Sequence, residues 1–223
     1  MEITLEDVWY SYPGQKGWAL KGVSASLGNG RLTVVTGPNG SGKTTLLKVA
    51  GLLLKPRRGR VLVNGADYWV QPAEKRVDLR RNIVYVQEKP VMLRGSVAYN
   101  VAYGLIVRGV RLGEALRRAE RALARLGGLH LIDKDARSLS LGEARLVSIA
   151  RAIAVSPQVL LLDDPFLGLD EEKKKVLLEF LEEYRRRGVS IIVATHETHA
   201  IEGADTLLKI NYGSLTLANH GRR

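Results

Sequence analysis

The residues most able to do chemistry form one glycine-rich segment, Gly37-Pro38-Asn39-Gly40-Ser41-Gly42-Lys43-Thr44. It matches the pattern G-x-x-x-x-G-K-[ST], whose glycines let successive backbone N–H groups turn toward phosphate oxygens. Lys43 is expected to reach the β- and γ-phosphates, and the Thr44 hydroxyl to bind Mg²⁺. A plain glycine-rich turn is the alternative, but the strand-like run Leu32–Thr36 before the segment and the helical pattern after it argue against that. With Thr45, the segment predicts a site for MgATP.

A second candidate is the carboxylate that ends an apolar run. Val159–Leu162 reads as a buried strand, and Asp163 follows it directly. Such a strand would bring Asp163 to the edge of a sheet beside the phosphate loop, where it can hold Mg²⁺ through water. Strands often end in Asp, so this signal gains its weight from the phosphate loop and from the Asp164-Pro165 pair that follows.

Several shorter motifs, in this order and spacing, resemble the ATP-binding cassette (ABC) ATPases over nearly the whole chain. Leu139-Ser140-Leu141-Gly142-Glu143 resembles the signature sequence of that family, and Gly168-Leu169-Asp170 resembles its D-loop. Gln87 resembles the Q-loop glutamine, and His196 the switch histidine. Each motif is weak alone, and the combination is specific.

The resemblance implies roles for these residues. Tyr12 would stack on adenine, and Gln87 would sense the γ-phosphate and Mg²⁺. Asp164, His196, Gln87 and Lys43 would form the catalytic set. The residues also have plainer interpretations: Tyr12 as a strand aromatic, Gln87 as a solvated strand end, and His196 as a loop histidine.

The resemblance also implies a shared site. The hydroxyl of Ser140 and the backbone N–H groups around Gly142 would contact the γ-phosphate bound to a partner subunit. Two ATP-binding subunits, as a homodimer, would then pack head to tail, with a transmembrane permease as the further partner. ATP binding would close the pair, and hydrolysis would reopen it.

Two residues depart from the family pattern. Asp164 stands where the family usually has the Glu that polarises the attacking water. Leu141 replaces the first glycine of the signature pair, and a bulky side chain enters a loop that must approach phosphate closely. We therefore expect an ATPase that binds ATP normally and hydrolyses it slowly.

The elements that must position these residues follow from hydrophobic periodicity. Strands are expected at Ile3–Tyr10, Val23–Leu27, Leu32–Thr36, Arg60–Val63, Ile83–Val86, Val159–Leu162, Ser190–Ala194 and Thr206–Ile210. Helices are expected at Lys43 to about Leu53, Val97–Val107, Leu112–Leu126, Glu143–Val155 and Glu171–Arg187.

This pattern predicts an α/β fold with a mostly parallel sheet and an inserted helical subdomain. The resemblance makes it a P-loop NTPase core with N-terminal antiparallel strands. Residues 1–88 and 158–223 are predicted to form the nucleotide-binding core, and residues 89–157 the helical signature subdomain.

The amino-acid composition limits the chemistry, the partners and the cellular location that the protein can have. The chain of 223 residues has no Cys, which excludes disulfides and thiolate chemistry, and its longest apolar runs are far shorter than a membrane span. The net charge of +11 is open to two interpretations: attraction to nucleic acid or an anionic membrane, or solvated Arg-rich helix faces. We expect no specific nucleic acid, and a cytoplasmic protein peripheral to the inner face of the cell membrane.

The leading hypothesis is therefore the ATPase subunit of an ABC transporter, importer-like around Gln87-Glu88-Lys89-Pro90, with tungstate, molybdate or phosphate as candidate cargo. A soluble ABC ATPase that acts on nucleic acid and a slow nucleotide-gated clamp are the alternatives.

Overall fold

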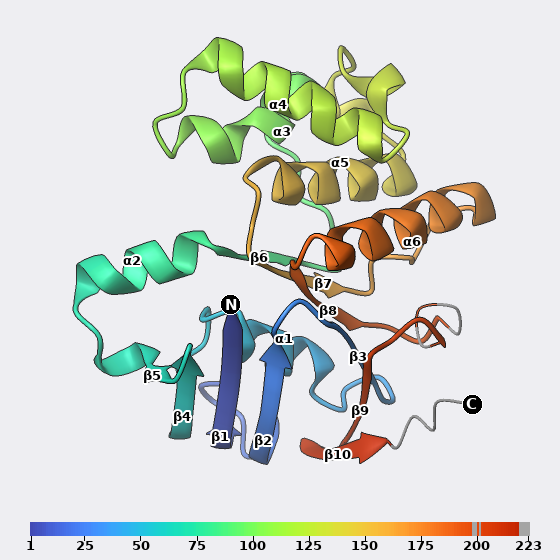
Figure 1. Ribbon diagram of the computed structural model, residues 1–223. Helices are drawn as coiled ribbons and strands as arrows, with labels where there is room; N and C mark the ends of the chain where they lie inside the picture. Colours follow the sequence, from blue (N-terminus) through green and yellow to red (C-terminus); the bar gives the residue numbers. More distant parts are fainter. Residues whose placement is uncertain (198–199, 201, 219–223) are drawn as a thin grey trace. The chain divides into compact units, whose positions relative to one another are not determined.

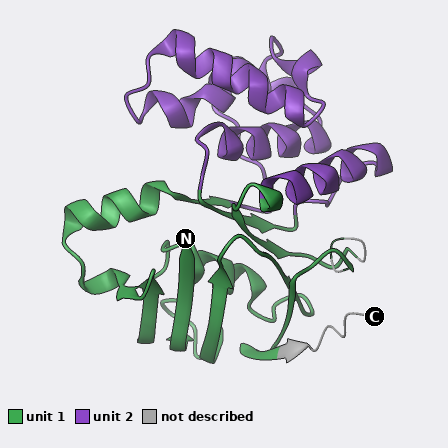
Figure 2. Ribbon diagram, in the orientation of Figure 1, with its two compact units in different colours: residues 1–85, 158–164, 185–223 green, residues 86–157, 165–184 purple. Residues whose placement is uncertain are grey.

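The computed structural model describes residues 1–197, 200 and 202–218 of the chain (Figure 1). Contacts divide it into two compact units, coloured separately in Figure 2. Unit 1 comprises Met1–Tyr85, Gln158–Asp164 and Arg185–Arg223, and unit 2 comprises Val86–Pro157 and Pro165–Tyr184. The predicted subdomain, 89–157, falls inside unit 2, and its bounds as a domain stay a prediction.

The larger sheet has the strand order β10-β9-β3-β8-β7-β6. Its strands are β3 (Leu32–Thr36), β6 (Ile83–Val86), β7 (Val159–Asp163), β8 (Ser190–Ala194), β9 (Thr206–Asn211) and β10 (Ser214–Ala218). β3 runs parallel to both β8 and β9, and β7 runs parallel to β8. Every residue of β7 and β8 is buried, which explains their continuous apolar sequences.

A second, antiparallel sheet of unit 1 has the order β2-β1-β4-β5. Its strands are β1 (Glu2–Tyr10), β2 (Leu20–Gly28), β4 (Arg58–Val63) and β5 (Ala66–Asp67). Alternate residues of β1, including Ile3 and Leu5, are buried in one apolar cluster with Leu46 and Leu47 of α1 (Lys43–Ala50). Burying such a side chain stabilises the fold by about 1.5–3 kcal/mol, so this cluster fixes the helix that follows the glycine-rich loop.

Unit 2 is built from helices (Figure 1). These are α3 (Val97–Ile106), α4 (Leu112–Arg125), α5 (Leu141–Ala154) and α6 (Glu171–Arg186) up to Tyr184. In α4, Ala115, Ala119, Ala122 and Leu123 are buried, which is the spacing of one helix face. The opposite face carries charge.

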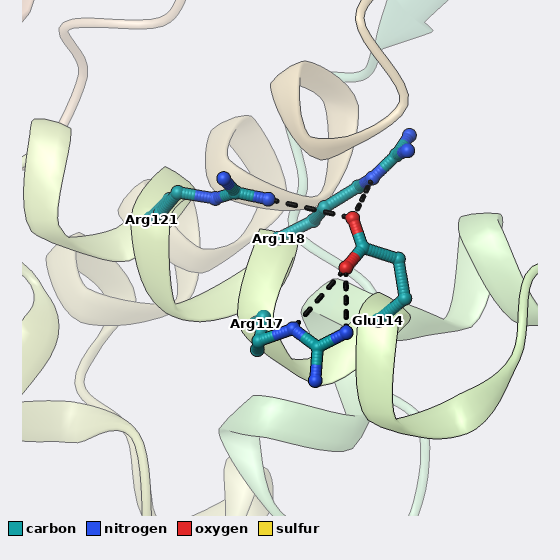
Figure 3. A network of polar contacts seen from close by, with 4 residues as sticks. All are labelled: Glu114, Arg117, Arg118 and Arg121. Carbon is teal, nitrogen blue, oxygen red and sulfur yellow. Dashed lines mark hydrogen bonds and ion pairs between the residues drawn. The ribbon is translucent and has the colours of Figure 1, made fainter.

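On that charged face of α4, one carboxylate contacts three arginines (Figure 3). Glu114 lies 2.9 Å from Arg117, 2.8 Å from Arg118 and 3.5 Å from Arg121. Hydrogen bonds from Arg118 and then Arg117 lower the pKa of Glu114. This part of the basic charge is therefore a solvated helix face with an internal counter-charge, as the plainer interpretation of the composition predicts.

The mixed α/β fold is as predicted, and most element bounds agree to within three residues. α1 ends at Ala50 instead of about Leu53, because Leu52 takes a left-handed conformation with φ 59°. α2 (Ala73–Arg81) was not predicted; it has no buried residue and so lacks an apolar stripe. β5, β10 and three short 3₁₀ helices, Tyr68–Val70, Leu129–Leu131 and Ala136–Ser138, were not predicted either. Among the described residues, no helix is both long and apolar enough to span a membrane.

Candidate functional site

The glycine-rich loop connects β3 to α1 in a conformation that only glycine allows at two positions. Gly37 has φ 152° and Gly42 has φ 112°. A Cβ atom would lie 2.1 Å from the carbonyl oxygen of Ile210 at Gly37, and 2.6 Å from that of Ala19 at Gly42. Neighbouring backbone therefore surrounds the loop closely, and the loop is pre-shaped.

The hairpin between β9 and β10 also holds this loop. The backbone N–H of Gly213 donates to the carbonyl oxygen of Ser41 at 2.9 Å, and the N–H of Ser41 donates to Pro38 at 3.2 Å. Pro38, Asn39 and Gly40 are exposed, whereas the Ser41 hydroxyl oxygen is buried and has no hydrogen-bond partner among the described residues. A buried hydroxyl without a partner, beside glycines at positive φ, fits a loop that accepts an external group with hydrogen-bonding oxygens.

The ammonium of Lys43 makes three contacts. Its Nζ donates to the carbonyl oxygens of Gly37 and Pro38 at 2.7 and 3.2 Å, and lies 3.1 Å from Nε2 of His196. An ammonium has three protons and no lone pair, so Lys43 is the donor in this contact and Nε2 the acceptor. Lys43 is itself buried. The loop carbonyls and the imidazole thus occupy all three donors.

The topology of the parallel strands explains this proximity. β8 lies between β3 and β7, so their carboxyl ends meet at one edge of the sheet. The glycine-rich loop follows β3, Asp163 ends β7, and His196 comes two residues after β8. The N–H of Thr195 donates to Val35 at 3.1 Å, which fixes the chain just before His196.

The two consecutive aspartates differ in their surroundings. Asp163 is 3% exposed, and its Oδ2 accepts a hydrogen bond of 2.9 Å from the hydroxyl of Tyr85 on β6. Asp164 has left its strand: its φ is 43°, in the left-handed region, and its N–H donates to Ala194 at 2.8 Å. Asp tolerates this region better than most residues, so the sequence suits the turn.

Tyr12 is attached to the helix that follows the loop. Its hydroxyl lies 3.2 Å from the Thr45 hydroxyl, and its ring packs edge-on against Tyr10 with centroids 5.1 Å apart. Tyr12 is half-buried. Its predicted stacking on adenine stays a prediction.

The donor set suits magnesium bound together with phosphates. Among the described residues, no group of three or more His, Asp or Glu side chains could hold a metal by itself. Mg²⁺ usually takes one or two protein oxygens and completes its shell with water and phosphate oxygens. Thr44 at the start of α1 and Asp163 at the end of β7 offer that kind of shell.

The predicted signature residues lie in unit 2, at the start of α5. Ser140 caps this helix: its hydroxyl oxygen accepts from the N–H of Glu143 at 3.3 Å, and its own N–H donates to the Glu143 carboxylate at 2.8 Å. Lys134 and then this Ser140 N–H lower the pKa of Glu143 to about 2. A Cβ at Gly142 would lie 2.7 Å from the carbonyl oxygen of Gly168, which accounts for the glycine there.

Two further predicted residues complete the set in unit 2. Gln87 follows β6, and its Nε2 donates to the carbonyl oxygen of Lys89 at 2.8 Å. The side chain of Leu141 is 57% exposed. Unit 1 therefore brings together Tyr12, the loop from Gly37 to Thr45, Asp163, Asp164 and His196, while Gln87, Ser140 and Gly142 belong to unit 2.

Sequence reasoning missed two features. The first is the role of Tyr85, which the sequence places within the strand Ile83–Val86. A buried tyrosine hydroxyl usually needs a hydrogen-bond partner, and that requirement was the available signal.

The second missed feature is a set of hydrogen bonds that hold the backbone of residues 91–93. Arg151 donates to the carbonyl oxygens of Val91 and Asn100, both at 2.9 Å, and Asn100 donates to Leu93 at 3.0 Å. No local pattern links these distant positions.

Comparison with known proteins identifies the family. Residues 20–167 match the family model described as ABC transporter. A putative ABC transporter ATP-binding protein of Pyrococcus horikoshii is 37% identical over 217 residues, 96% of this chain and 81% of the relative. The molybdate/tungstate import ATP-binding protein WtpC of that organism is 34% identical over 84% of this chain, but only 53% of its own length is matched.

Solved structures agree. The structure of cbiO1 from Clostridium perfringens, part of the ABC transporter complex cbiONQ, superposes with a TM-score of 0.82 and 30% identity over 96% of this chain and 86% of that one. A dimeric bacterial ABC transporter cassette, MJ0796, shares the fold with a TM-score of 0.87 over 98% and 100%, at 24% identity. With the family model and the long sequence matches, these likenesses establish that the chain belongs to the ABC transporter family, as an ATP-binding subunit.

Proposed function

We propose that the chain hydrolyses MgATP at a site shared by two copies and drives an importer in the cell membrane. The observation that carries this proposal is the gathering of Lys43, His196 and Asp163 at one edge of the parallel sheet, at the carboxyl ends of β3, β8 and β7. A pre-shaped glycine loop, a buried cation, a carboxylate and an imidazole are the groups that phosphoryl transfer requires.

Each residue has a physical task in this proposal. The N–H groups between Gly37 and Thr45 would cradle the phosphates, and Lys43 would exchange its loop carbonyls for phosphate oxygens. The Thr44 hydroxyl and Asp163 would hold Mg²⁺, which would neutralise charge on the phosphates. Asp164 would orient and deprotonate the attacking water, with His196 beside the γ-phosphate and Gln87 contributing to the same end.

The capping box of Ser140 supports a site completed by a second copy. Its hydroxyl oxygen accepts from the N–H of Glu143, and the hydroxyl also bonds to the Glu143 carboxylate, which a phosphate would replace as the acceptor of its proton. Ser140 is exposed, and the N-terminal end of α5 adds a positive dipole. These features suit a γ-phosphate presented by another subunit, so we infer a head-to-tail homodimer.

An exposed apolar surface of unit 2 supports a membrane partner. Val91, Tyr99, Tyr103 and Val107 are 56, 40, 39 and 61% exposed. Arg151 and Asn100 hold the backbone around Val91, so this surface is ordered before any partner binds. Preordered apolar groups lower the entropic cost of association. We infer that a short helix of the permease binds here, at the inner face of the membrane.

The importer assignment follows the relatives. WtpC is named as a molybdate/tungstate importer subunit, and a Natronomonas pharaonis protein that is 38% identical over 81% of this chain is named as a phosphate importer subunit. Both cargoes are oxyanions. On that support we propose an oxyanion importer.

Crosslinking in native membranes tests the partner. Because the chain has no Cys, Val91→Cys introduces a single thiol for a photoactivatable crosslinker. Val70→Cys is the matched control, since Val70 is 75% exposed and lies in unit 1. We expect Val91→Cys to capture a protein with several membrane spans, encoded as a transporter subunit, and Val70→Cys to miss it. Equal capture by both variants, or capture of soluble proteins only, would contradict the docking surface.

A further inference from the structure

We propose that Tyr85 is a positioning residue that sets the magnesium site through Asp163. The inference rests on the metal-binding role proposed for Asp163. Tyr85 touches neither nucleotide nor metal in this proposal, and it acts by fixing the carboxylate that does.

The contact joins two neighbouring strands of one sheet. β6 lies beside β7, and the Tyr85 hydroxyl donates to Oδ2 of Asp163 over 2.9 Å. Asp163 is 3% exposed, and no other side chain among the described residues forms a hydrogen bond with it. The ring of Tyr85 packs on the apolar cluster of unit 1. Because the ring is held by packing, the hydroxyl is held at one place.

The chemistry of the partner matters. A lysine or arginine in the place of Tyr85 would neutralise the carboxylate and weaken its attraction for a cation. A phenol donates one hydrogen bond and adds no net charge, so it orients Asp163 without opposing the approach of a cation. With Oδ2 engaged, the rotation of the carboxylate is restricted, and Oδ1 remains for the water shell of Mg²⁺. Outer partners of this kind typically change metal affinity by about 10- to 100-fold.

Tyr85→Phe removes one oxygen and keeps the ring, so it tests the hydroxyl alone. The probe is Mn²⁺, followed by electron paramagnetic resonance, with the full chain saturated by a non-hydrolysable ATP analogue. We expect Mn²⁺ to bind about 10-fold more weakly to Tyr85→Phe, while the affinity for the analogue in EDTA is unchanged. Tyr212→Phe is the matched control, since Tyr212 is 79% exposed, and it should bind Mn²⁺ like the natural protein. A purely structural role would lower the melting temperature and leave Mn²⁺ affinity of the folded protein unchanged, which would overturn the proposal.

Asp163→Asn separates the inference from the function on which it rests. The phosphates of the analogue bind Mn²⁺ themselves, so the affinity stays measurable in this variant. If Asp163→Asn binds Mn²⁺ as the natural protein does, the metal role of Asp163 fails. If Asp163→Asn weakens binding and Tyr85→Phe does not, only the role of Tyr85 fails. We expect both single variants to weaken it and the double variant to be no weaker than Asp163→Asn alone, because Tyr85 acts through that carboxylate.

Discussion

Lys43 and His196, 153 positions apart in the chain, share a hydrogen bond of 3.1 Å between Nζ and Nε2. With Gly37 and Pro38 accepting the other two protons, the ammonium has no free donor before nucleotide arrives. In the proposed function, phosphate oxygens would replace these acceptors, and that exchange would release Nε2 of His196. The group proposed to bind phosphate and the group proposed for catalysis are thus already hydrogen-bonded to each other.

Removal of the Lys43 charge should weaken ATP binding by about 1.5–3 kcal/mol, the value of hydrogen bonds to charged groups. Lys43→Ala is compared with Lys48→Ala, which removes the same charge from the same helix, α1. Isothermal titration with MgATP should show the loss for Lys43→Ala only. Equal affinity of the two variants would remove Lys43 from the site.

Tyr12 should act through its ring. Tyr12→Ala should weaken ATP binding by about 1–3 kcal/mol, the usual worth of a base stacked on an aromatic ring. Tyr12→Phe loses the 3.2 Å hydroxyl contact with Thr45 and keeps the ring, so its affinity should stay close to natural. Nucleotide titration of the three proteins decides this. If Tyr12→Phe is as weak as Tyr12→Ala, the hydroxyl contact, and not stacking, holds the nucleotide.

The left-handed backbone conformation of Asp164 determines which substitutions can test its role without disturbing the fold. Asn tolerates φ 43° as Asp does, so Asp164→Asn removes the charge with little backbone cost. Single-turnover ATP hydrolysis should fall by about 10²-fold or more, as expected for loss of a general base. Asp164→Glu should hydrolyse faster than the natural protein, but at a cost in stability of about 1–3 kcal/mol, because Glu fits this region poorly. An unchanged rate of ATP hydrolysis in Asp164→Asn would show that Asp164 is not a catalytic residue.

Acid should remove the contribution that Glu143 makes to stability. Its pKa is lowered to about 2, so its ion pair with Lys134 stabilises the fold above the usual carboxyl pKa near 4.5 and is lost as the pH falls toward 2. Glu143→Gln should therefore melt lower than the natural protein at pH 7, and the gap should close between pH 4.5 and 2. Because Lys134 is half-exposed, the gap will be small and will shrink in salt. A gap that is constant with pH would contradict the pairing.

The sequence predicted the part of the site that local chemistry controls. The glycine loop and Asp163 were predicted because each follows an apolar strand, and His196 was predicted from its resemblance to the switch histidine. The order of their strands in a parallel sheet brings the three to one edge. The αL turn at Asp164 and the missed helix α2 follow from backbone conformation and polarity that periodicity does not report. The Tyr85–Asp163 contact depends on which strands are neighbours, 78 positions apart, and no spacing rule gives that.

The central claim is that two copies complete one another's ATP site, and complementation tests it most directly. Lys43→Ala disables the phosphate loop, and Ser140→Arg disables the signature loop that would contact the partner's nucleotide. Each variant alone should be inactive in single-turnover ATP hydrolysis. Thr216→Arg, which adds the same charge at an exposed strand position, is the control and should stay active. In a head-to-tail pair, mixing the two inactive variants creates mixed dimers with one fully natural site. The account predicts that an equimolar mixture regains about a quarter of the natural activity, and a mixture as inactive as its two components would contradict it.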